Sequence, residues 1–528
     1  MALTANSYDY IIVGAGTAGC VLAARLSEDL QTRVLLLEAG GKDSAREIHI
    51  PAAFSKLFKT NVDWNYSTEP EARLHNRKLY WPRGKVLGGS SSINAMIYIR
   101  GNPADFDHWR DLGNPGWSFA DVLPYFKKSE DQERGGSELH GEGGPIHVAD
   151  PRCVNPLTRA FLSAASELGI PANADFNGDT QDGAGLYQLT QKDGARCSAA
   201  DGYLKPAYGR PNLTVLTGAH VARVIIDNGV ASGVKFLRDG VLQTARADAE
   251  LILAGGTVNS PQVLMLSGIG AADELKRLGI RVVRDLPGVG QNLQDHPMVS
   301  VGYLCSQKVS LDGAETLANL LRYLIFKSGP LTSNVAEAGL FLRTRAGLQT
   351  PDLQLLFGPA YYRAHGLVRR KEHCFGFGPT LIAPESRGSI SLRCTNPLDA
   401  PAIRANYLST DADLRTMVAG VRLARRLANA KAFDHYRGEE LHPGPQAETD
   451  DDIVEFLRNE VETLYHPVGT CKMGDDASAV VDARLRVHGV ERLRVVDASI
   501  MPRVPAGNTN APVVMIAEKA ADMIREDA

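Results

Sequence analysis

Cysteine is scarce in this chain, and its spacing excludes two of its usual structural uses. Seven cysteines are spread over 528 residues, and no two of them form a CxxC pair. A disulfide framework or a structural zinc site would need paired or regularly spaced cysteines. We therefore expect free thiols, no bound metal and a reducing, cytoplasmic compartment.

Long apolar runs are also missing. No stretch reaches the ~20 apolar residues that span a bilayer, and Met1–Ser7 is short and carries no basic residue that would mark a secretion signal. The most apolar candidate is 317–327, whose leucines and Ile325 share one helical face. The sequence favours a helix packed on the core there. The alternative is a surface in peripheral contact with a membrane, or one that lines a substrate entrance.

Basic charge is not in excess either. The chain has 57 Lys and Arg against 61 Asp and Glu, which gives a net charge of −4. Binding to nucleic acid depends on clustered cations that release counterions, so a nucleic-acid partner is not expected. The apolar fraction of 44% is ordinary for a globular protein. The length exceeds one compact core and predicts two lobes.

A glycine-rich turn between two apolar runs opens the chain. Gly14, Gly16 and Gly19 follow the first run in the spacing GxGxxG, and the second run ends in Glu38. Gly14 permits a tight turn, Gly16 lets a pyrophosphate approach the backbone, and Gly19 lets a helix pack on the strand. Glu38 is placed to bind a ribose hydroxyl and to repel a 2′-phosphate. This order predicts a site for a dinucleotide, either FAD or NAD.

Two further segments are rich in small residues. One runs over 83–95, and the other is an apolar run at 251–256 that ends in glycines and precedes a helix predicted at 259–270. Small residues let the backbone come close to a large flat ligand.

Two runs that overlap these segments resemble the two signature regions of the glucose–methanol–choline (GMC) family of flavin oxidoreductases. The matching regions are 84–101 and 256–270, and 286–296 and 496–502 also resemble family elements. The resemblance runs from about Tyr8 to Ile524, and within the family the chain is most similar to bacterial alkanol dehydrogenases. Choline and polyethylene glycol dehydrogenases are similar too.

The resemblance implies FAD, and it implies which residues hold it. They are Gly14, Gly16, Gly19 and Glu38 for the ADP part; Gly88, Gly89, Asn94 and Ala95 along the isoalloxazine; Val221 at the adenine through its backbone; and Asp497, Ala498, Asn508 and Thr509 near the pyrophosphate and the ring. Some family members attach FAD through a histidine just before the asparagine at 94. This chain has Ile93 there, so we expect FAD to be bound non-covalently.

A histidine near the C-terminus is the candidate base. Thr449 is predicted to cap a helix that ends near Tyr465, because Pro467 disfavours helical geometry in the residue before it. His466 would then lie at a helix exit. An imidazole with an ordinary pKa near ~6.5 can take a hydroxyl proton near neutral pH.

The chemistry that this implies is alcohol oxidation. His466 would remove the hydroxyl proton while the flavin N5 accepts a hydride from the carbon. By the family resemblance, Asn510 would hydrogen-bond the substrate oxygen and orient it. A capping role for Asn510 beside Pro512 is the alternative, and both roles can hold together.

The expected fold is α/β, with a Rossmann-type FAD-binding lobe interleaved with an α+β substrate lobe built on an antiparallel sheet. The first lobe is assigned to 1–150, 211–298 and 461–528, and the second to 151–210 and 299–460. Phe357, Tyr361 and Tyr362 are candidates for lining an apolar pocket in the second lobe.

The expected function is FAD-dependent oxidation of primary alcohols, with electrons passed to a quinone or another acceptor. Three alternatives stay open. One is an alcohol oxidase that uses oxygen. Another is a choline dehydrogenase, whose cationic substrate needs an aromatic or acidic cage; Glu337 decides little here, since similar acids occur in relatives with neutral substrates. The last is a flavin-binding protein without turnover, which would have no need for both His466 and Asn510.

Overall fold

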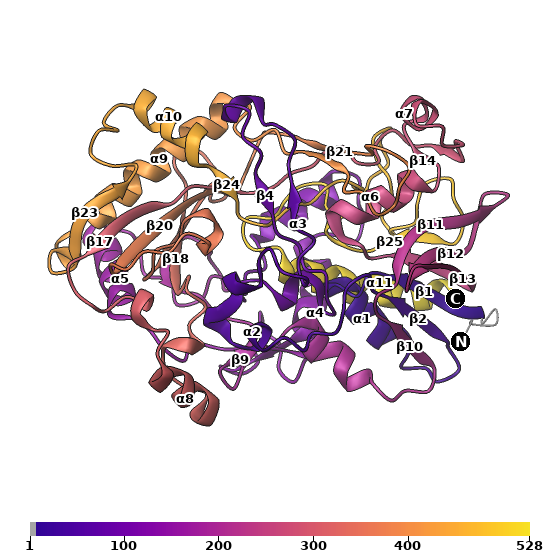
Figure 1. Ribbon diagram of the computed structural model, residues 1–528, viewed down its shortest axis with the longest axis horizontal. Coiled ribbons are helices and arrows are strands. Elements are labelled where there is room, and N and C mark those ends of the chain that lie inside the picture. Colours follow the sequence, from indigo (N-terminus) through magenta and orange to yellow (C-terminus); the bar gives the residue numbers. More distant parts are fainter. Residues whose placement is uncertain (1–6) are drawn as a thin grey trace.

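The computed structural model describes residues 7–528 and shows two lobes, each built on its own sheet (Figure 1). We call them the Rossmann lobe, on the right of Figure 1, and the antiparallel lobe, on the left. The α/β fold expected from the sequence is confirmed. The expectation that Met1–Ser7 is not a secretion signal concerns residues of which 1–6 lie outside the described part.

The Rossmann lobe has a seven-stranded sheet in the order β10-β2-β1-β13-β12-β11, with β25 beside β13. The bounds are β1 Ser7–Val13, β2 Val34–Leu37, β10 Leu213–Leu216, β11 His220–Asp227, β12 Val230–Arg238, β13 Val241–Leu253 and β25 Leu493–Val495. Strand β1 runs parallel to β2 and β13, whereas β12 runs antiparallel to both of its neighbours. Strand β2 is apolar throughout and fully buried because both faces of this part of the sheet are covered.

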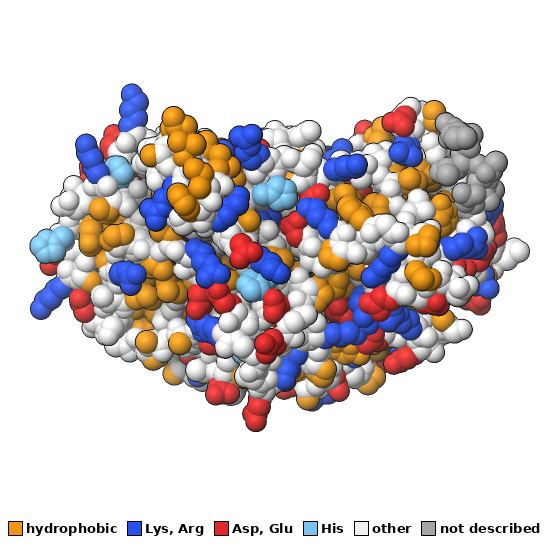
Figure 2. Space-filling model, turned by 90° about the horizontal axis from the view of Figure 1, so that it is seen from below, with side chains coloured by type: hydrophobic (Ala, Val, Ile, Leu, Met, Phe, Trp, Pro, Cys, Tyr) orange, Lys and Arg blue, Asp and Glu red, His pale blue; other side chains and the backbone are white. Residues whose placement is uncertain are grey.

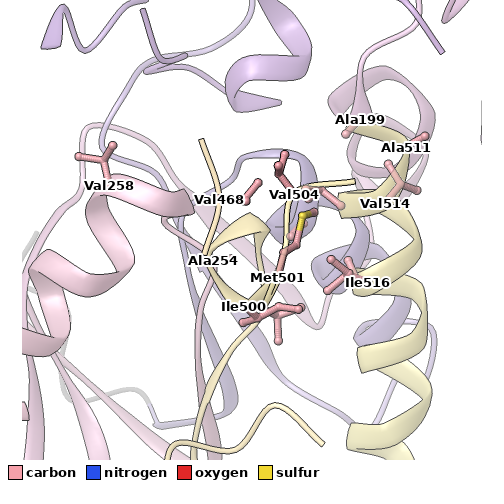
Figure 3. Packing of buried hydrophobic residues seen from close by; sticks show 14 of the residues in the cluster. Ala199, Ala254, Val258, Val468, Ile500, Met501, Val504, Ala511, Val514 and Ile516 are labelled. Carbon is pink, nitrogen blue, oxygen red and sulfur yellow. The ribbon is translucent and has the colours of Figure 1, made fainter. Parts of the chain in front are cut away.

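Two helices from opposite ends of the sequence pack together on this sheet. Helix α1, Thr17–Leu26, follows β1, and α11, Asn510–Asp527, is the last element of the chain. Figure 3 shows Ile516 of α11 on the side of the helix toward Met501 and Val504, which lie on the segment between β25 and α11. All three side chains are buried, so this packing fixes the start of α11 against the Rossmann lobe.

The antiparallel lobe has an eight-stranded sheet in the order β23-β17-β20-β19-β18-β7, with β16 and β24 attached beside β20. The bounds are β7 Gly183–Leu186, β16 Pro297–Met298, β17 Val301–Cys305, β18 Ala338–Leu342, β19 Leu353–Gly358, β20 Cys374–Leu381, β23 Arg437–His442 and β24 Glu462–Thr463. Helices α5, Pro156–Glu167, and α9, Asp411–Ala428, contact its strands. Stacked aromatic rings fill the space between, with Phe161 and Phe357 at a centroid distance of 4.8 Å.

The remaining helices cover the edges of the two lobes. They are α2 Arg46–His49, α3 Pro103–Asp111, α4 Phe119–Ser129, α6 Gly256–Leu266, α7 Ala272–Arg277, α8 Leu317–Phe326 and α10 Asp450–Glu460. Short 3₁₀ turns include η1 at Pro51–Leu57, η3 at Gly89–Ser92 and η7 at Pro330–Thr332. Strands β16 and β24 belong to the second sheet but lie in stretches that the sequence analysis gave to the other lobe. The division of the chain into residue ranges stays a prediction.

Helix α10 begins as predicted and ends earlier. Thr449 and Asp452 form a capping box at its start. The helix stops at Glu460 and does not reach Tyr465, because Glu462 and Thr463 pair with β16 in extended form. The prediction of a helix exit at His466 was therefore wrong, and a strand delivers this histidine to its place.

Helix α8 forms where the apolar run predicted a helix, but the expectation that it packs on the core was wrong. Tyr323 is its only fully buried side chain. Leu317 and Phe326 are both 72% exposed. Across residues 7–528, no helix is both long enough and apolar enough to cross a bilayer.

Candidate active site

A cavity of about 310 Å³ is lined by residues of both lobes. It runs from the turn after β1, past the segment 84–95, to His466 and the aromatic side chains around it. Most of the predicted cofactor residues line it: Gly14, Gly16, Glu38, Gly89, Asn94, Ala95, Val221, Asp497, Ala498, Asn508 and Thr509. Both predicted catalytic residues, His466 and Asn510, line it too. Gly19 and Gly88 lie behind the lining and shape the backbone there.

The turn after β1 is shaped for a ligand. A Cβ on Gly19 would overlap the carbonyl oxygen of Gly14, so only glycine lets α1 pack so close to the strand. Gly14 has a φ of 101°, which favours glycine. A Cβ on Gly16 would have no protein atom nearer than 4.0 Å, and Gly16 lines the cavity. The open space in front of Gly16, at the N-terminus of α1, is where a pyrophosphate would approach the backbone.

Glu38 lies at the end of β2, beside this turn. Its Oε2 accepts a hydrogen bond from the Ala15 amide at 2.8 Å, and its Oε1 accepts one from the Gly40 amide at 2.7 Å. Burial raises the pKa of Glu38 to about 7, although both amide bonds oppose the rise. Each carboxylate oxygen has a second lone pair, so the side chain can also accept from a ribose hydroxyl in the cavity.

The segment around η3 forms the middle of the cavity. Gly88 has a φ of 85°, and Gly89 lies so close to Gly16 that a Cβ on it would come within 2.6 Å of the Gly16 Cα. The Oδ1 of Asn94 accepts hydrogen bonds from the Met96 amide at 2.9 Å and from Arg196 at 2.7 Å. These bonds hold the loop against the rest of the fold. Ile93 is buried and lines the cavity.

Asp497, after β25, ties three segments together. Its Oδ2 accepts from the Gly256 amide at 2.8 Å and from the Ser260 hydroxyl at 2.5 Å. Its Oδ1 accepts from the Ser499 amide at 2.8 Å. Burial raises the pKa of Asp497, and these donors oppose the rise. The carboxylate thus fixes the start of α6 beside the cavity.

His466 is held on both sides through its backbone. Tyr465 before it has a φ of 71°, an uncommon conformation for a bulky residue. The backbone N–H of His466 donates to Asp295 Oδ1 at 2.8 Å. Arg83 donates to the Tyr465 carbonyl at 2.6 Å. Pro467 follows and excludes helical geometry at His466. These constraints leave the imidazole little freedom to turn away from the cavity.

The ring of His466 has a defined partner on each nitrogen. Its Nδ1 lies 3.0 Å from Nδ1 of His296, and its Nε2 lies 3.2 Å from Nδ2 of Asn508. An amide nitrogen can only donate, so Nε2 of His466 is the unprotonated acceptor and Nδ1 carries the proton. Burial, then His296, then Arg83 lower the pKa of His466 well below 6.5. The imidazole is therefore neutral at pH 7, and its lone pair is at Nε2, where it accepts the hydrogen bond from Asn508.

The structure places Asn508 against the histidine and Asn510 elsewhere. Asn510 is the first residue of α11, and its Oδ1 accepts a hydrogen bond from the Thr17 hydroxyl at 2.8 Å. Among the hydrogen bonds of residues 7–528, none joins Asn510 to His466. The Oδ1 of Asn508 is buried without a partner in the same described region. The catalytic role predicted for Asn510 stays a prediction, whereas the contact with His466 belongs to Asn508.

Sequence reasoning missed the residues behind His466. Asp295 and His296 lie in a segment that the sequence analysis noted only as a family element, yet they support the backbone and the ring of His466. Trp64 and His220 line the end of the cavity beside Val221, and their rings are 5.8 Å apart. No periodicity marks these four positions, because the contacts join segments far apart in the chain.

The end of the cavity around His466 is mostly apolar, apart from Arg83 and Asn508. Its lining includes Phe54, Phe58, Ile97, Met298, Val335, Leu356, Tyr362, Leu464 and Tyr465. The acids that line the cavity are Glu38 and Asp497, and both already accept bonds from backbone amides. Phe357 and Tyr362 line the cavity as predicted. Tyr361 does not, and its hydroxyl contacts His442 at 3.1 Å.

Glu337 takes no part in this lining. Its carboxylate accepts from the Asn155 amide at 2.8 Å, the Thr158 hydroxyl at 2.6 Å and the Ser333 hydroxyl at 2.7 Å. The side chain is buried by these partners and is absent from the cavity wall. It braces the fold and does not offer a charge to a ligand.

Comparison with known proteins covers nearly the whole chain. A family profile described as GMC oxidoreductase matches residues 8–298, and a second profile of the same description matches residues 384–517. The chain is 45% identical to an alcohol dehydrogenase [acceptor] of Pseudomonas putida, over 98% of this chain and 95% of that one. It is 45% identical to the mitochondrial choline dehydrogenase of Mus musculus, over 98% of this chain and 90% of that one. The solved structure of a pyridoxine 4-oxidase from Mesorbium loti is 34% identical, with a TM-score of 0.91 and 99% of both chains covered.

Proposed function

The chain belongs to the GMC oxidoreductase family, in which FAD-dependent enzymes act on CH–OH groups, and on that premise we propose that it oxidises primary alcohols, aliphatic or aromatic, to aldehydes. The observation that supports this most is the neutral His466, whose unprotonated Nε2 faces an apolar end of the cavity. Such a base takes a hydroxyl proton and needs no charge on the substrate.

The residues of the cavity fit FAD. The open space before Gly16, the N-terminus of α1 and the spare lone pairs of Glu38 suit a pyrophosphate and a ribose. The small residues from Gly89 to Ala95 leave room for a flat ring. FAD, when bound, supplies the acceptor for the hydride that leaves the alcohol carbon. We propose that the cofactor is held without a covalent bond, because Ile93 has no atom that could form one.

The protein's own part in the reaction is to hold the alcohol and to move one proton. His466 takes the hydroxyl proton at Nε2, and its low pKa keeps it ready for this at neutral pH. The amide of Asn508, which donates to Nε2 here, would turn its N–H to the substrate oxygen and so leave the Nε2 lone pair to the hydroxyl proton. We assign to Asn508 the orienting role that the sequence suggested for Asn510. Nδ1 of His296 accepts a hydrogen bond from the Nδ1–H of His466 and so keeps Nε2 unprotonated.

A neutral alcohol suits the cavity better than choline. The wall around His466 presents alkyl and aromatic groups, and the two carboxylates of the lining are occupied by backbone amides. Choline is the second candidate, since Phe58, Tyr362 and Tyr465 offer aromatic faces that can hold a quaternary ammonium group. The similarity to a choline dehydrogenase gives the same support to this candidate as to the first.

The electron acceptor is proposed to be a quinone or another carrier other than oxygen. The Pseudomonas putida relative, whose name includes "acceptor", supports this. An oxidase that uses oxygen is the alternative, and the similarity to a pyridoxine 4-oxidase favours it. A flavin-binding protein without turnover is disfavoured, because the arrangement of Asp295, His296 and Asn508 around His466 serves no purpose in mere binding.

An anaerobic titration of the purified holoenzyme tests the proposal. 1-Octanol, benzyl alcohol and choline are added in turn, and the flavin absorbance is followed before and after air is admitted. Bleaching by either neutral alcohol at far lower concentration than by choline is the expected result, with slow recovery in air. Bleaching by choline alone would favour the second candidate. Fast recovery with formation of peroxide would assign the protein as an oxidase, and no bleaching by any of the three would overturn the proposal.

A further inference from the structure

Helix α8 exposes an unusual amount of apolar surface. Leu317 and Phe326 are each 72% exposed, and Ile325 is 66% exposed. Leu321 and Leu324 are also exposed, so apolar side chains point outward along the whole helix. Single exposed leucines are normal on a protein surface, but five large apolar side chains on ten residues indicate a surface that is covered by something.

The helix is firmly anchored although most of it is exposed. The Thr316 side chain caps its start by accepting from the Asn319 amide at 3.1 Å. Tyr323 is buried, and its hydroxyl donates to the His49 carbonyl at 2.8 Å. Tyr323 also packs with Ile50, Ala53 and Leu331. The exposed side chains are therefore presented by a fixed helix.

Cations surround this apolar surface. Arg322 and Lys327 are on or beside the helix. The loop just before the helix carries Glu315, which forms ion pairs with Lys56 at 3.0 Å and with Arg369 at 3.2 Å. These two pairs bring Lys56 and Arg369 close to the helix. The segments involved carry six cations, Lys56, Arg322, Lys327, Arg369, Arg370 and Lys371, against the three acids Asp312, Glu315 and Glu372. The sign of this region is opposite to the net charge of −4 of the whole chain.

Figure 2 views the molecule from below, the side on which α8 lies in Figure 1. It shows apolar side chains gathered at the upper left, in the region of α8, with Lys and Arg side chains around them. Leu367 and Val368, on the loop that carries Arg369, are exposed as well and extend the apolar surface. We call this surface, made of α8 and residues 367–371, the α8 face.

We propose that the α8 face docks on the surface of a lipid bilayer that contains anionic phospholipids. The apolar side chains of α8 would enter the level of the acyl chains, and the flanking cations would meet the headgroup phosphates. Long Lys and Arg side chains reach headgroups while their stems stay in apolar surroundings. Because none of the helices in residues 7–528 can cross the bilayer, the contact is peripheral.

A second copy of the chain fits this surface less well. A stable dimer interface buries about 800 Å² on each partner and depletes Lys at its centre. Helix α8 protrudes alone from the antiparallel lobe (Figure 1). Cations flank it, so a second copy would bring the same positive charge against it. An anionic bilayer matches both the apolar helix and the sign of the charge.

The α8 face is connected to the cavity. Through Tyr323, the helix rests on the segment that includes α2 and η1, and η1 carries Phe54. Phe54, together with the adjoining Phe58, lines the apolar end of the cavity. Docking would therefore place the wall of the cavity nearest to η1 close to the lipid.

Sedimentation of the full-length holoenzyme with vesicles tests the proposal. The vesicles are made of phosphatidylcholine alone or with about one third phosphatidylglycerol. We expect binding to the anionic vesicles that falls as salt rises, because exposed charges are screened. The double variant Ile325→Ser with Phe326→Ser should bind at least about ten-fold more weakly. The variant Arg322→Gln with Lys327→Gln should lose a similar amount, about ten-fold, on anionic vesicles only.

Matched controls separate docking from damage to the fold. Val241→Ser with Leu242→Ser removes two exposed apolar side chains from the strand turn on the other lobe, and Lys276→Gln with Arg277→Gln removes two exposed cations of α7. Both should bind vesicles as the wild type does, and all four variants should keep their flavin. Absence of wild-type binding, or unchanged binding by the Ile325–Phe326 variant, would overturn the proposal. A wild-type dimer that only this variant dissociates, without vesicle binding, would assign the face to a second copy. None of these readouts depends on turnover.

Discussion

The Nδ1 atoms of His296 and His466 lie 3.0 Å apart, with the two buried rings perpendicular to each other at 88°. One proton is shared between these two atoms. Because Asn508 donates to Nε2 of His466, that proton is on His466 and His296 accepts it. His296 therefore sets which nitrogen of the base is free, although it does not line the cavity.

We predict that His296→Ala lowers kcat about ten- to hundred-fold with little change in KM, since it leaves the Nδ1–H of His466 without an acceptor. The variant also shifts the acid limb of the pH profile. In the wild type, burial and His296 hold the pKa of His466 below 6.5, so kcat/KM should stay level from pH 8 to below pH 6.5. Without His296 and with water in its place, the pKa rises and the fall begins at higher pH.

The conservative variant His296→Asn is the control for that experiment. An asparagine oxygen can take the place of Nδ1 and restore the acceptor. Its kcat should recover most of the loss, because the acceptor for the Nδ1–H of His466 is restored. Equal kcat in the alanine variant and the wild type would remove His296 from the mechanism.

Replacement of the base itself should have the largest effect. His466→Ala is expected to keep its yellow FAD and to slow reduction of the flavin by alcohol at least ~100-fold, as is typical when a general base is lost. Stopped-flow absorbance under anaerobic conditions measures this rate directly. Near-normal reduction in this variant would show that another group takes the proton.

Substitution of Asn508, just before α11, and of Asn510, its first residue, should affect different steps. Asn508→Ala removes the group beside Nε2 of His466 and should lower kcat about a hundred-fold, the cost of losing an orienting donor. Asn510→Ala removes the acceptor of the Thr17 hydroxyl, so it should weaken FAD binding about ten-fold and leave kcat of the loaded enzyme nearly unchanged. The reverse pattern would restore the role that the sequence suggested for Asn510.

A substitution at Gly16 tests the cofactor site without changing the residues proposed to act on the alcohol. Gly16→Ala adds a methyl group that meets no protein atom within 4.0 Å but projects into the cavity. We expect a folded protein with at least about ten-fold weaker FAD binding, seen in its flavin content after gel filtration. Gly41→Ala is the control, since its methyl group meets nothing within 4 Å and Gly41 is not part of the cavity wall. Equal flavin content in both variants would move the pyrophosphate away from Gly16.

The attachment of the cofactor is tested by acid precipitation. Ile93 stands where a covalent attachment would need a histidine, so we expect the yellow chromophore to stay in the supernatant. In the variant Ile93→His, a buried apolar side chain is replaced by an imidazole. The flavin content of this variant measures whether the site tolerates the imidazole ring. Wild-type colour that stays with the pellet would contradict non-covalent binding.

Local patterns predicted well the parts of the fold that local rules govern. The strand, turn and helix from β1 to α1 follow from apolar runs and glycine spacing, and the start of α10 follows from Thr449. The end of α10 does not, because it depends on pairing between Glu462 and a strand more than 160 residues earlier. Nothing in the residues around Glu462 indicates which distant strand it pairs with.

The same limit applies to the active site. Asn508 and Asn510 are two residues apart in one motif, and which of them faces His466 depends on where α11 begins. His296 was out of reach as well, since a histidine 170 positions away becomes a partner only when β16 and β24 pair. The exposure of α8 could not be predicted either, because an apolar stripe has the same pattern whether the fold covers it or not.

The hydrogen bond between Thr17 and Asn510 joins residues 493 positions apart. Helix α1 begins at the first of them and helix α11 at the second, so both walls of the cofactor site near this bond come from the two ends of the chain. During synthesis, the first wall leaves the ribosome long before the second exists. The bond can form only once this last helix has been made, so the two segments that meet at this point of the cofactor site come together late in synthesis.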